Sequence, residues 1–258
     1  MTDEAIDFEE WSDSGDNHNP SALNSSKGPN KFRPVNRPPM AILLIFDDGQ
    51  ETSEATRIRN DQTTIGRNAD VSIPHDPGIA DQHARIIRSR GRDKYKWRVQ
   101  DLESPSGLFV RVKKAVLREG TEFLAGSHHY TFTDAPQIPQ GTTKLRARLD
   151  AGSIPGQSMF QSEVAYPSIR RIQAEGSERL WLIAEDYWIG RDKSCGLCVP
   201  DDRLLADKHV QLTKTSEGWQ LSSYGVTNGF WVRMKEVQVT KSCTFQLGEQ
   251  RFRLIVDL

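Results

Sequence analysis

The stretch that decides the fold is "TTIGRNADVSIPHDPGIADQHARI", which runs from Thr63 to Ile86. A similar stretch, "WIGRDKSCGLCVPDDRLLADKHVQL", runs from Trp188 to Leu212. In each, Gly-Arg ends an apolar strand, an acidic loop follows, and Ala-Asp-x-His opens the next apolar strand. The chain therefore contains the same strand–loop–strand unit twice.

The similarity continues downstream, so the unit belongs to a longer internal repeat. "SGLFVRV" (106–112) corresponds to "NGFWVRM" (228–234), and each is followed by further strands and a late Gly. Gly126 follows Gly107 by 19 residues, and Gly248 follows Gly229 by the same 19 residues. Two copies of about 90 residues each are too long for solenoid units and have the size of free-standing domains.

The residues between these motifs alternate as β-strands do. In "YKWRVQDL" (95–102), Tyr95, Trp97 and Val99 fall on one face, with polar or charged side chains on the other. Gly, Asp, Asn and Pro interrupt the strands at short intervals, and no segment has the periodicity of an amphipathic helix. We therefore predict an all-β protein with two antiparallel β-sandwich domains.

Composition divides the chain into four segments. Residues 1–39 are poor in apolar side chains and rich in Ser, Asn, Asp and Pro, which predicts a disordered tail. Residues 134–166 are rich in Pro, Gly, Gln and Ser, which predicts a flexible linker. The strand-rich segments 40–133 and 167–258 are the two expected domains.

Charge and cysteine content indicate the expected environment. The chain has 34 Lys and Arg against 35 Asp and Glu, so its net charge of −1 gives no overall attraction to nucleic acid or membrane. No apolar run approaches the ~18 residues of a membrane span, and the N-terminus lacks the pattern of a signal peptide. Three cysteines do not make a disulfide framework. We expect a cytoplasmic protein without a membrane partner.

Two other features allow more than one interpretation. The run "RIIRSRGRDKYKWR" (85–98) is either the exposed side of a hairpin or a basic patch; we favour the hairpin and expect no nucleic-acid partner. Cys195 and Cys198 of "CGLC" have only Cys243 elsewhere to complete a four-ligand zinc site, so we expect structural thiols and no metal. Because no catalytic constellation emerges, we expect neither an enzyme nor a cofactor.

The ordered motifs of each repeat resemble the forkhead-associated (FHA) domain, a β-sandwich whose loops bind phosphothreonine peptides. The matching motifs are the Gly-Arg strand end, the His that opens a strand, Asn-Gly ahead of an aromatic-rich strand, and the late Gly. The resemblance covers roughly residues 40–133 and 167–258. It implies that the Gly-Arg arginine and a Ser three residues before the His hold the phosphate. It also implies that the Asn of Asn-Gly and the residue before it grip the peptide backbone.

The resemblance assigns an expected role to each matching residue. The residues expected to bind a phosphopeptide are Arg191, Thr227, Asn228, Lys208, Arg67 and Ser106. Among these, Lys208 is a substitute donor, and Ser106 stands where the family has Asn. The residues expected to support the loops are Gly190, His209, Gly229, Gly66, His83 and Gly107.

Both repeats depart from the family at the Ser position, where they have Ala80 and Ala206. An Ala side chain cannot donate, and losing a hydrogen bond to a charged group costs about 1.5–3 kcal/mol. The neighbouring Asp81 and Asp207 also place negative charge near the expected phosphate. Because the first repeat lacks the Asn as well, we expect the second repeat to provide the better site.

The sequence leaves three functions open. The first is a signalling adaptor that binds a phosphothreonine-containing segment of a partner protein, mainly through the second domain. The second is phosphate-independent protein assembly by degenerate FHA sandwiches. The third is docking of the chain's own phosphorylated tail or linker, for which Thr142, Thr143, Thr52 and Thr56 are candidate threonines.

Overall fold

A computed structural model describes residues 38–46, 53–92, 94–135, 166–172, 177–223 and 225–256. The expected tail and linker lie almost wholly outside these ranges. The described residues form strands and turns and contain no helix, so the all-β prediction is confirmed. None of their elements is a helix of the length and hydrophobicity that crossing a membrane requires.

The first packed body, called sandwich 1, has two sheets around one core. One sheet has the order β7-β19-β20-β1-β2, and the other has the order β18-β6-β5-β3-β4. The strands of sandwich 1 are β1 (Ala41–Phe46), β2 (Ser53–Ile58), β3 (Gln62–Gly66), β4 (Val71–Ser72), β5 (Ala84–Arg90), β6 (Tyr95–Asp101), β7 (Leu108–Val112), β18 (Glu236–Val239), β19 (Ser242–Leu247) and β20 (Gln250–Val256).

The second packed body, sandwich 2, repeats this arrangement. Its sheets have the orders β12-β11-β10-β9-β17 and β14-β13-β15-β16-β8. The strands of sandwich 2 are β8 (Lys114–Val116), β9 (Glu122–Ala125), β10 (His128–Thr133), β11 (Ser168–Ile172), β12 (Ser177–Trp181), β13 (Asp186–Gly190), β14 (Leu197–Cys198), β15 (Val210–Thr215), β16 (Gly218–Ser222) and β17 (Phe230–Met234).

The two repeats exchange their last three strands. β20 from the end of the chain pairs with β1, and β10 of the first repeat pairs with β11 of the second. Phe252 is accordingly buried in one core with Leu43, whereas Phe123 is buried in the other core with Ile189. Each core therefore combines strands from both expected segments, 40–133 and 167–258. This differs from the sequence prediction, in which each segment forms its own sandwich.

The junctions before the exchanged strands explain why the chain crosses over. A single residue, Lys113, separates β7 from β8, and a single residue, Lys235, separates β17 from β18. A tight hairpin requires Asn or Gly with positive φ, but none of the residues with positive φ lies at either junction. Lys113 and Lys235 are not turn-forming residues, so neither junction favours a hairpin. The chain therefore runs straight on into the other sandwich.

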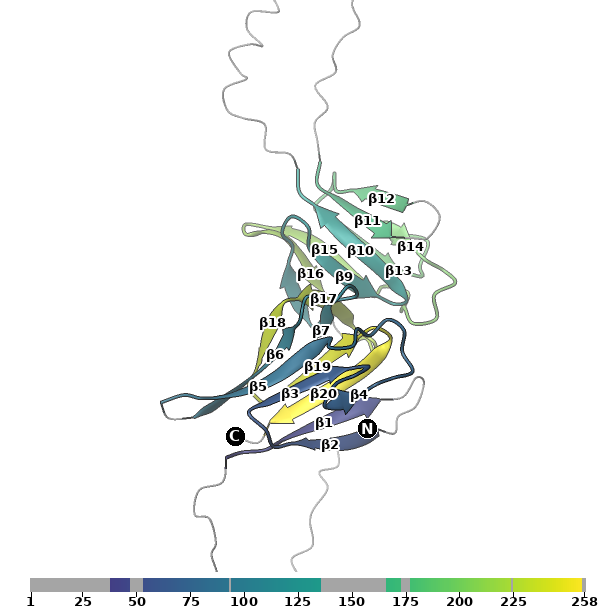
Figure 1. Cartoon of the computed structure of the whole chain (residues 1–258). Coiled ribbons are helices and arrows are strands. Elements are labelled where there is room, and N and C mark those ends of the chain that lie inside the picture. The colour runs from purple at the N-terminus through teal and green to yellow at the C-terminus, as the bar shows by residue number, and fades with distance from the viewer. Residues whose placement is uncertain are drawn as a thin grey trace, which may run out of the picture. The chain divides into compact units, whose positions relative to one another are not determined.

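Antiparallel pairing of β7 with β17 joins the two larger sheets. Val110 lies opposite Val232 in this pairing, which creates a continuous ten-stranded sheet. Figure 1 shows β7 and β17 in the middle of the chain's folded part, between the two groups of strands. The described residues from Pro38 onward accordingly form one compact unit.

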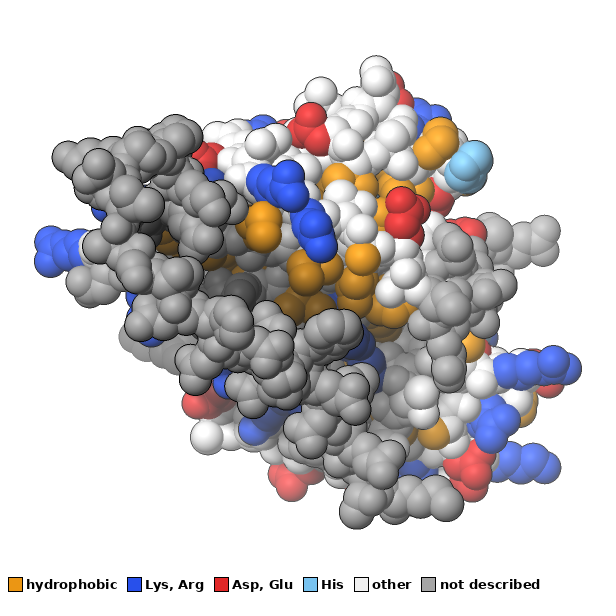
Figure 2. Space-filling view, turned by 90° about the horizontal axis from the view of Figure 1, so that it is seen from below, with side chains coloured by type: hydrophobic (Ala, Val, Ile, Leu, Met, Phe, Trp, Pro, Cys, Tyr) orange, Lys and Arg blue, Asp and Glu red, His pale blue; other side chains and the backbone are white. Residues whose placement is uncertain are grey.

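The basic hairpin predicted at 85–98 is β5 and β6, and it is only partly a free surface. Arg88 is 8% exposed, lies 2.7 Å from Asp61 Oδ1 and packs against the rings of Tyr95 and Trp97. Arg88, which belongs to the basic run 85–98, is thus a packed residue and not a free surface charge. On the described part of the face in Figure 2, basic and acidic side chains are interspersed.

The exchange makes each repeat dependent on the other. Residues 38–136 carry β1–β10 but not β18–β20, so we expect this fragment alone to give no stable monomer, because its first core lacks three strands. Mixing it with an equal amount of residues 166–258 should restore both cores and produce a 1:1 complex. Size-exclusion chromatography and circular dichroism of the separate and mixed fragments test this. Two folded monomers that do not associate would contradict the exchange.

Candidate functional site

Each Gly-Arg pair marks a close approach of two loops. A Cβ atom at Gly66 would lie 2.1 Å from the carbonyl oxygen of Asp81, and one at Gly190 would lie 2.1 Å from that of Asp207. Only Gly fits at such a distance. The approach lets the Arg191 N–H donate to the Ala206 carbonyl at 3.1 Å, as the Arg67 N–H does to the equivalent carbonyl of the first repeat at 3.0 Å.

A buried His connects the loops in each repeat. The Ala206 N–H donates to His209 Nδ1 at 3.0 Å, and His209 Nε2 lies 2.7 Å from the Gly229 carbonyl oxygen. Because Nδ1 accepts, the proton is on Nε2, which donates to Gly229. His83 makes the same two contacts, with Ala80 and Gly107, at 3.2 and 3.1 Å. Each His thus holds the arginine-side loop against the loop that precedes β7 or β17.

Ser106 and Asn228 occupy equivalent positions and fasten these loops in the same way. Asn228 Nδ2 donates to the Leu204 carbonyl at 2.9 Å, and Ser106 Oγ donates to the Gly78 carbonyl at 2.6 Å. The Asn228 amide oxygen accepts no hydrogen bond from the described part of the chain, so it remains an acceptor for a ligand. The hydroxyl of Ser106 gives its single proton to Gly78 and offers no amide group.

The two candidate arginines are paired with the aspartates that follow the alanines. Arg191 Nη2 lies 3.1 Å from Asp207 Oδ1, and Arg67 Nη2 lies 3.0 Å from Asp81 Oδ1. The four side chains are 42–74% exposed. Exposed pairs of this kind contribute about 0–1 kcal/mol. A stronger anion can therefore displace either aspartate at small cost, although the aspartate charge then remains nearby.

The other expected ligand residues surround the second site. The Lys208 ammonium lies 5.7 Å from the centre of the Trp188 ring, on the loop that carries Asp207. Thr227 is exposed, and its carbonyl oxygen accepts a hydrogen bond from Arg111 of β7. Arg191, Lys208 and the Thr227–Gly229 loop are thus held together by His209 and by an arginine from the other repeat.

Two buried aspartates, which sequence reasoning missed, complete the loops across the exchange. Asp202 accepts from the N–H groups of Leu204 and Ser127, at 2.9 and 2.7 Å, and Asp76 accepts from those of Gly78 and Glu249, both at 2.7 Å. Burial acts to raise the pKa of Asp202, but these N–H donors outweigh it and the pKa lies below the ordinary value. Asp76 and Asp202 stand at the same position ahead of the Ala in their repeats, and this shared position is the sequence signal that could have identified them.

The two thiols of "CGLC" lie beside the second site. Cys195 Sγ is 3.2 Å from the Asp207 carbonyl oxygen, and Cys198 Sγ is 3.4 Å from that of Arg191. Both are free thiols. No group of three or more metal-ligating side chains occurs among the residues that the structure describes. Their contacts are those of structural thiols that pack against the loop backbone.

Comparison with known proteins places the two repeats in one family. The family described as FHA domain matches residues 63–126 and 187–249. Among solved structures, the FHA domain of CT664 from Chlamydia trachomatis has 24% identity and a TM-score of 0.24, covering 28% of this chain and 70% of its own. The Slr1951 protein from Synechocystis sp. has 26% identity and a TM-score of 0.24, covering 32% and 85%. No curated protein matches the chain.

The buried histidines predict a pH dependence of stability. Burial lowers the pKa of His209 and of His83 below the ordinary value of 6.5. A lowered histidine pKa stabilises the fold fully above pH 6.5, and this contribution is lost as the pH falls from 6.5 through the lower folded value. We expect the melting temperature to fall over that range. In the double variant His83→Gln/His209→Gln, the melting temperature should fall less over that pH range. If its pH profile equals that of the unmodified chain, the two histidines are not neutral in the folded protein.

Proposed function

Because the chain is a tandem FHA domain protein, we propose that it is a protein-interaction adaptor that binds phosphothreonine-containing segments, mainly through the Gly190–Arg191 site. FHA domains are interaction modules rather than enzymes, and they generally bind phosphothreonine. We propose the second repeat as the main binding site and a phosphothreonine segment as its ligand. We also propose that the protein acts in signalling in the cytoplasm.

The observation that carries the proposal is the double contact of His209. Its ring joins the Ala206 amide to the Gly229 carbonyl, and these backbone groups flank the two halves of the expected site. Arg191 lies on one half and Asn228 on the other. A phosphate carries three acceptor oxygens and about −1.5 to −2 charges, which suits the Arg191 fork and the Lys208 ammonium.

The first repeat has the same framework but fewer groups for a ligand. Arg67 is available, yet Ser106 replaces the Asn, and its hydroxyl already donates to Gly78. Neither repeat has a hydroxyl at the Ala position. The second site therefore keeps more donors and acceptors for both the phosphate and the peptide backbone, which is why we assign it the main role.

Phosphate-independent assembly is the second candidate function. It is favoured by the contacts of Arg67 and Arg191, each of which already has a carboxylate partner on its own loop. A partner of this kind would bind equally well with and without phosphate. Docking of the chain's own threonines stays a prediction, since Thr52, Thr142 and Thr143 lie outside the described residues.

Removal of the Arg191 side chain tests the phosphate contact. We expect Arg191→Ala to weaken binding of a selected phosphothreonine peptide by roughly ten- to a hundredfold, because a charge-assisted hydrogen bond is lost. The equivalent change Arg67→Ala is the matched control and should have a much smaller effect. Calorimetric titration of each variant with the phosphorylated and unphosphorylated peptide measures this. Equal binding of both peptides by the unmodified chain would favour phosphate-independent assembly.

Neutralising Asp207 tests the competition for Arg191. We expect Asp207→Asn to tighten phosphopeptide binding by about three- to tenfold, because it removes both a competing partner and a repulsive charge. The variant Ala206→Ser should tighten it further by adding a hydroxyl donor. Titration of both variants beside Asp81→Asn, which lies in the other repeat, checks the assignment. If neither change in the second repeat tightens binding, the phosphate does not lie where we place it.

A further inference from the structure

Two pockets occupy equivalent positions on the two sides of the β7–β17 pairing. The Arg111 pocket, of about 500 Å³, is formed by the end of β7, the 223–229 loop and the segment from β18 to β19. The Arg233 pocket, of about 860 Å³, is formed by the end of β17, the 100–104 segment and the chain from β8 to β9. The repeats align without gaps over these residues, so the two linings can be compared position by position.

The two pockets differ in charge. Four carboxylates line the Arg233 pocket, those of Glu122, Asp101, Glu103 and Glu236, and the equivalent residues of the other repeat are Thr244, Ser223, Gly225 and Lys114. Arg233 Nη1 lies 3.0 Å from Glu122 Oε1. Both pockets keep their arginine and the following lysine. The Arg111 pocket therefore has the corresponding cations but no carboxylate among its described lining residues.

Arg111 has no carboxylate partner among the described residues. Its Nη2 donates to the Thr227 carbonyl, and its other nitrogen donors are left for a ligand. Burial, and then the charges of Arg253 and Arg251, lower the pKa of Arg111. These three arginines therefore gather positive charge at the pocket, which attracts an anion.

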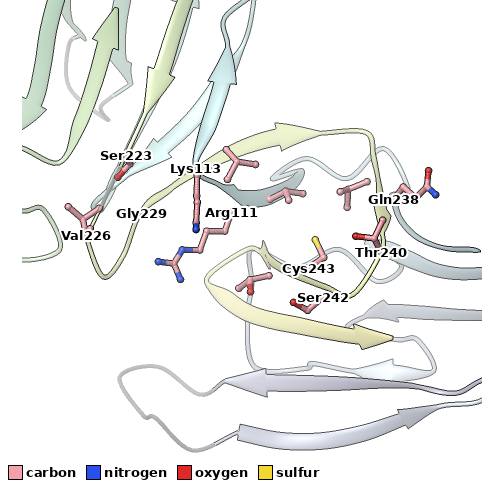
Figure 3. A pocket seen from close by; sticks show the side chains of 14 residues that line it. Arg111, Lys113, Ser223, Val226, Gly229, Gln238, Thr240, Ser242 and Cys243 are labelled. Carbon is pink, nitrogen blue, oxygen red and sulfur yellow. The ribbon is translucent and has the colours of Figure 1, made fainter. Parts of the chain in front are cut away.

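The two cations of the pocket lie on the same side of it. Figure 3 shows the side chains of Arg111 and Lys113 ending near each other, with the Arg111 guanidinium directed toward Val226 and Gly229 and away from Thr240 and Ser242. Thr240, in the turn before β19, and Ser242, the first residue of β19, are both exposed. Two neighbouring cations suit an oxyanion with several acceptor atoms and more than one charge.

We propose that the Arg111 pocket is a second, separate anion site that binds a phosphate group, with Arg111 and Lys113 as its cations. This site does not rest on the proposed role of Arg191. It exists because of the strand exchange: β17 pairs with β9, so Arg233 forms its ion pair with Glu122, whereas β7 pairs with β19, so Arg111 shares its pocket with Thr244. The phosphate has two sources to distinguish, a free ion or a phosphorylated group on a segment that also contacts the neighbouring 225–229 loop.

Titration of the full chain with inorganic phosphate tests the proposal, followed by NMR at the Arg111 Nε–H and Lys113 Nζ groups. The chain carries Arg191→Gln and Arg67→Gln, so that the other candidate sites do not contribute. We expect saturable shifts at Arg111 and Lys113. The variant Lys113→Gln should weaken binding at least about fivefold. Its matched control Lys235→Gln, at the equivalent position of the acidic pocket, should leave binding unchanged.

Thr244→Glu provides the sharper variant. It copies the Glu122–Arg233 pair that the chain already accommodates, so we expect a folded protein that no longer binds phosphate in this pocket. Retained dispersion of the amide resonances around Phe230 and Phe252 reports the fold. Unchanged phosphate binding in Thr244→Glu, or equal shifts at Lys235 and Lys113, would overturn the proposal. Because Arg191 is absent from this background, neither result bears on the Arg191 site.

A second titration separates the two sources of phosphate. A peptide with one phosphothreonine and a peptide with two are compared on the chain with Arg191 intact. If the doubly phosphorylated peptide shifts Arg111 and loses affinity in Thr244→Glu, the phosphate belongs to a bound segment. If only inorganic phosphate shifts Arg111, the ligand is a free ion. If neither phosphate nor peptide shifts Arg111, the pocket is not a phosphate site.

Discussion

Antiparallel pairing between β7 and β17 fixes the position of every other strand in the structure. The alternate residues of β7, Leu108 and Val110, enter the first core, while Phe230 and Val232 of β17 enter the second. Each strand then continues, after one residue, into the opposite sandwich. Because the two crossings are antiparallel neighbours, the cores are joined through a continuous set of backbone hydrogen bonds instead of a flexible connection.

The candidate sites inherit this arrangement, because each is completed by residues from the other repeat. Asp76 holds the turn at Glu249, Asp202 holds the turn at Ser127, and Arg111 supports the Thr227 carbonyl. These contacts recur in both repeats, since Arg233 contacts the Pro105 carbonyl as Arg111 contacts that of Thr227, and both aspartates are buried. The repeats differ at groups beside the expected ligand, such as the half-buried Ser106 against the half-buried Asn228. The framework has therefore been kept while the groups facing a ligand have diverged.

Much of the local structure could be predicted from the sequence. The alternation in 95–101 places Trp97 and Val99 in the core and leaves Lys96 and Arg98 on the surface, as the pattern requires. The FHA family could be predicted from motifs that recur in the same order twice. The ligand roles of Arg191 and Asn228 remain predictions. What the motifs do account for is why Gly190 must be Gly and why His209 is buried, since both follow from loop contacts within one repeat.

The exchange could not be predicted, because the two repeats present nearly the same surface to their terminal strands. Phe245 and Phe123, or Phe252 and Tyr130, occupy equivalent core positions, so side-chain pattern alone does not select a partner. The only local signal is the lack of turn residues at Lys113 and Lys235. For the same reason the Arg233–Glu122 pair was missed, because it joins residues that a simple division of the chain places in different domains.

The pairing of β1 with β20 has a consequence for how the protein is made. Ala41 lies opposite Val256, so β1 is synthesised about 200 residues before β20, the strand with which it pairs. At synthesis rates of about 5–20 residues per second, the interval lasts on the order of ten seconds or more. During that time the apolar faces of β1 and β5 lack their final covering, and pairing at such long sequence separation is slow. Nascent chains on one polysome therefore share a period in which they can exchange strands with each other.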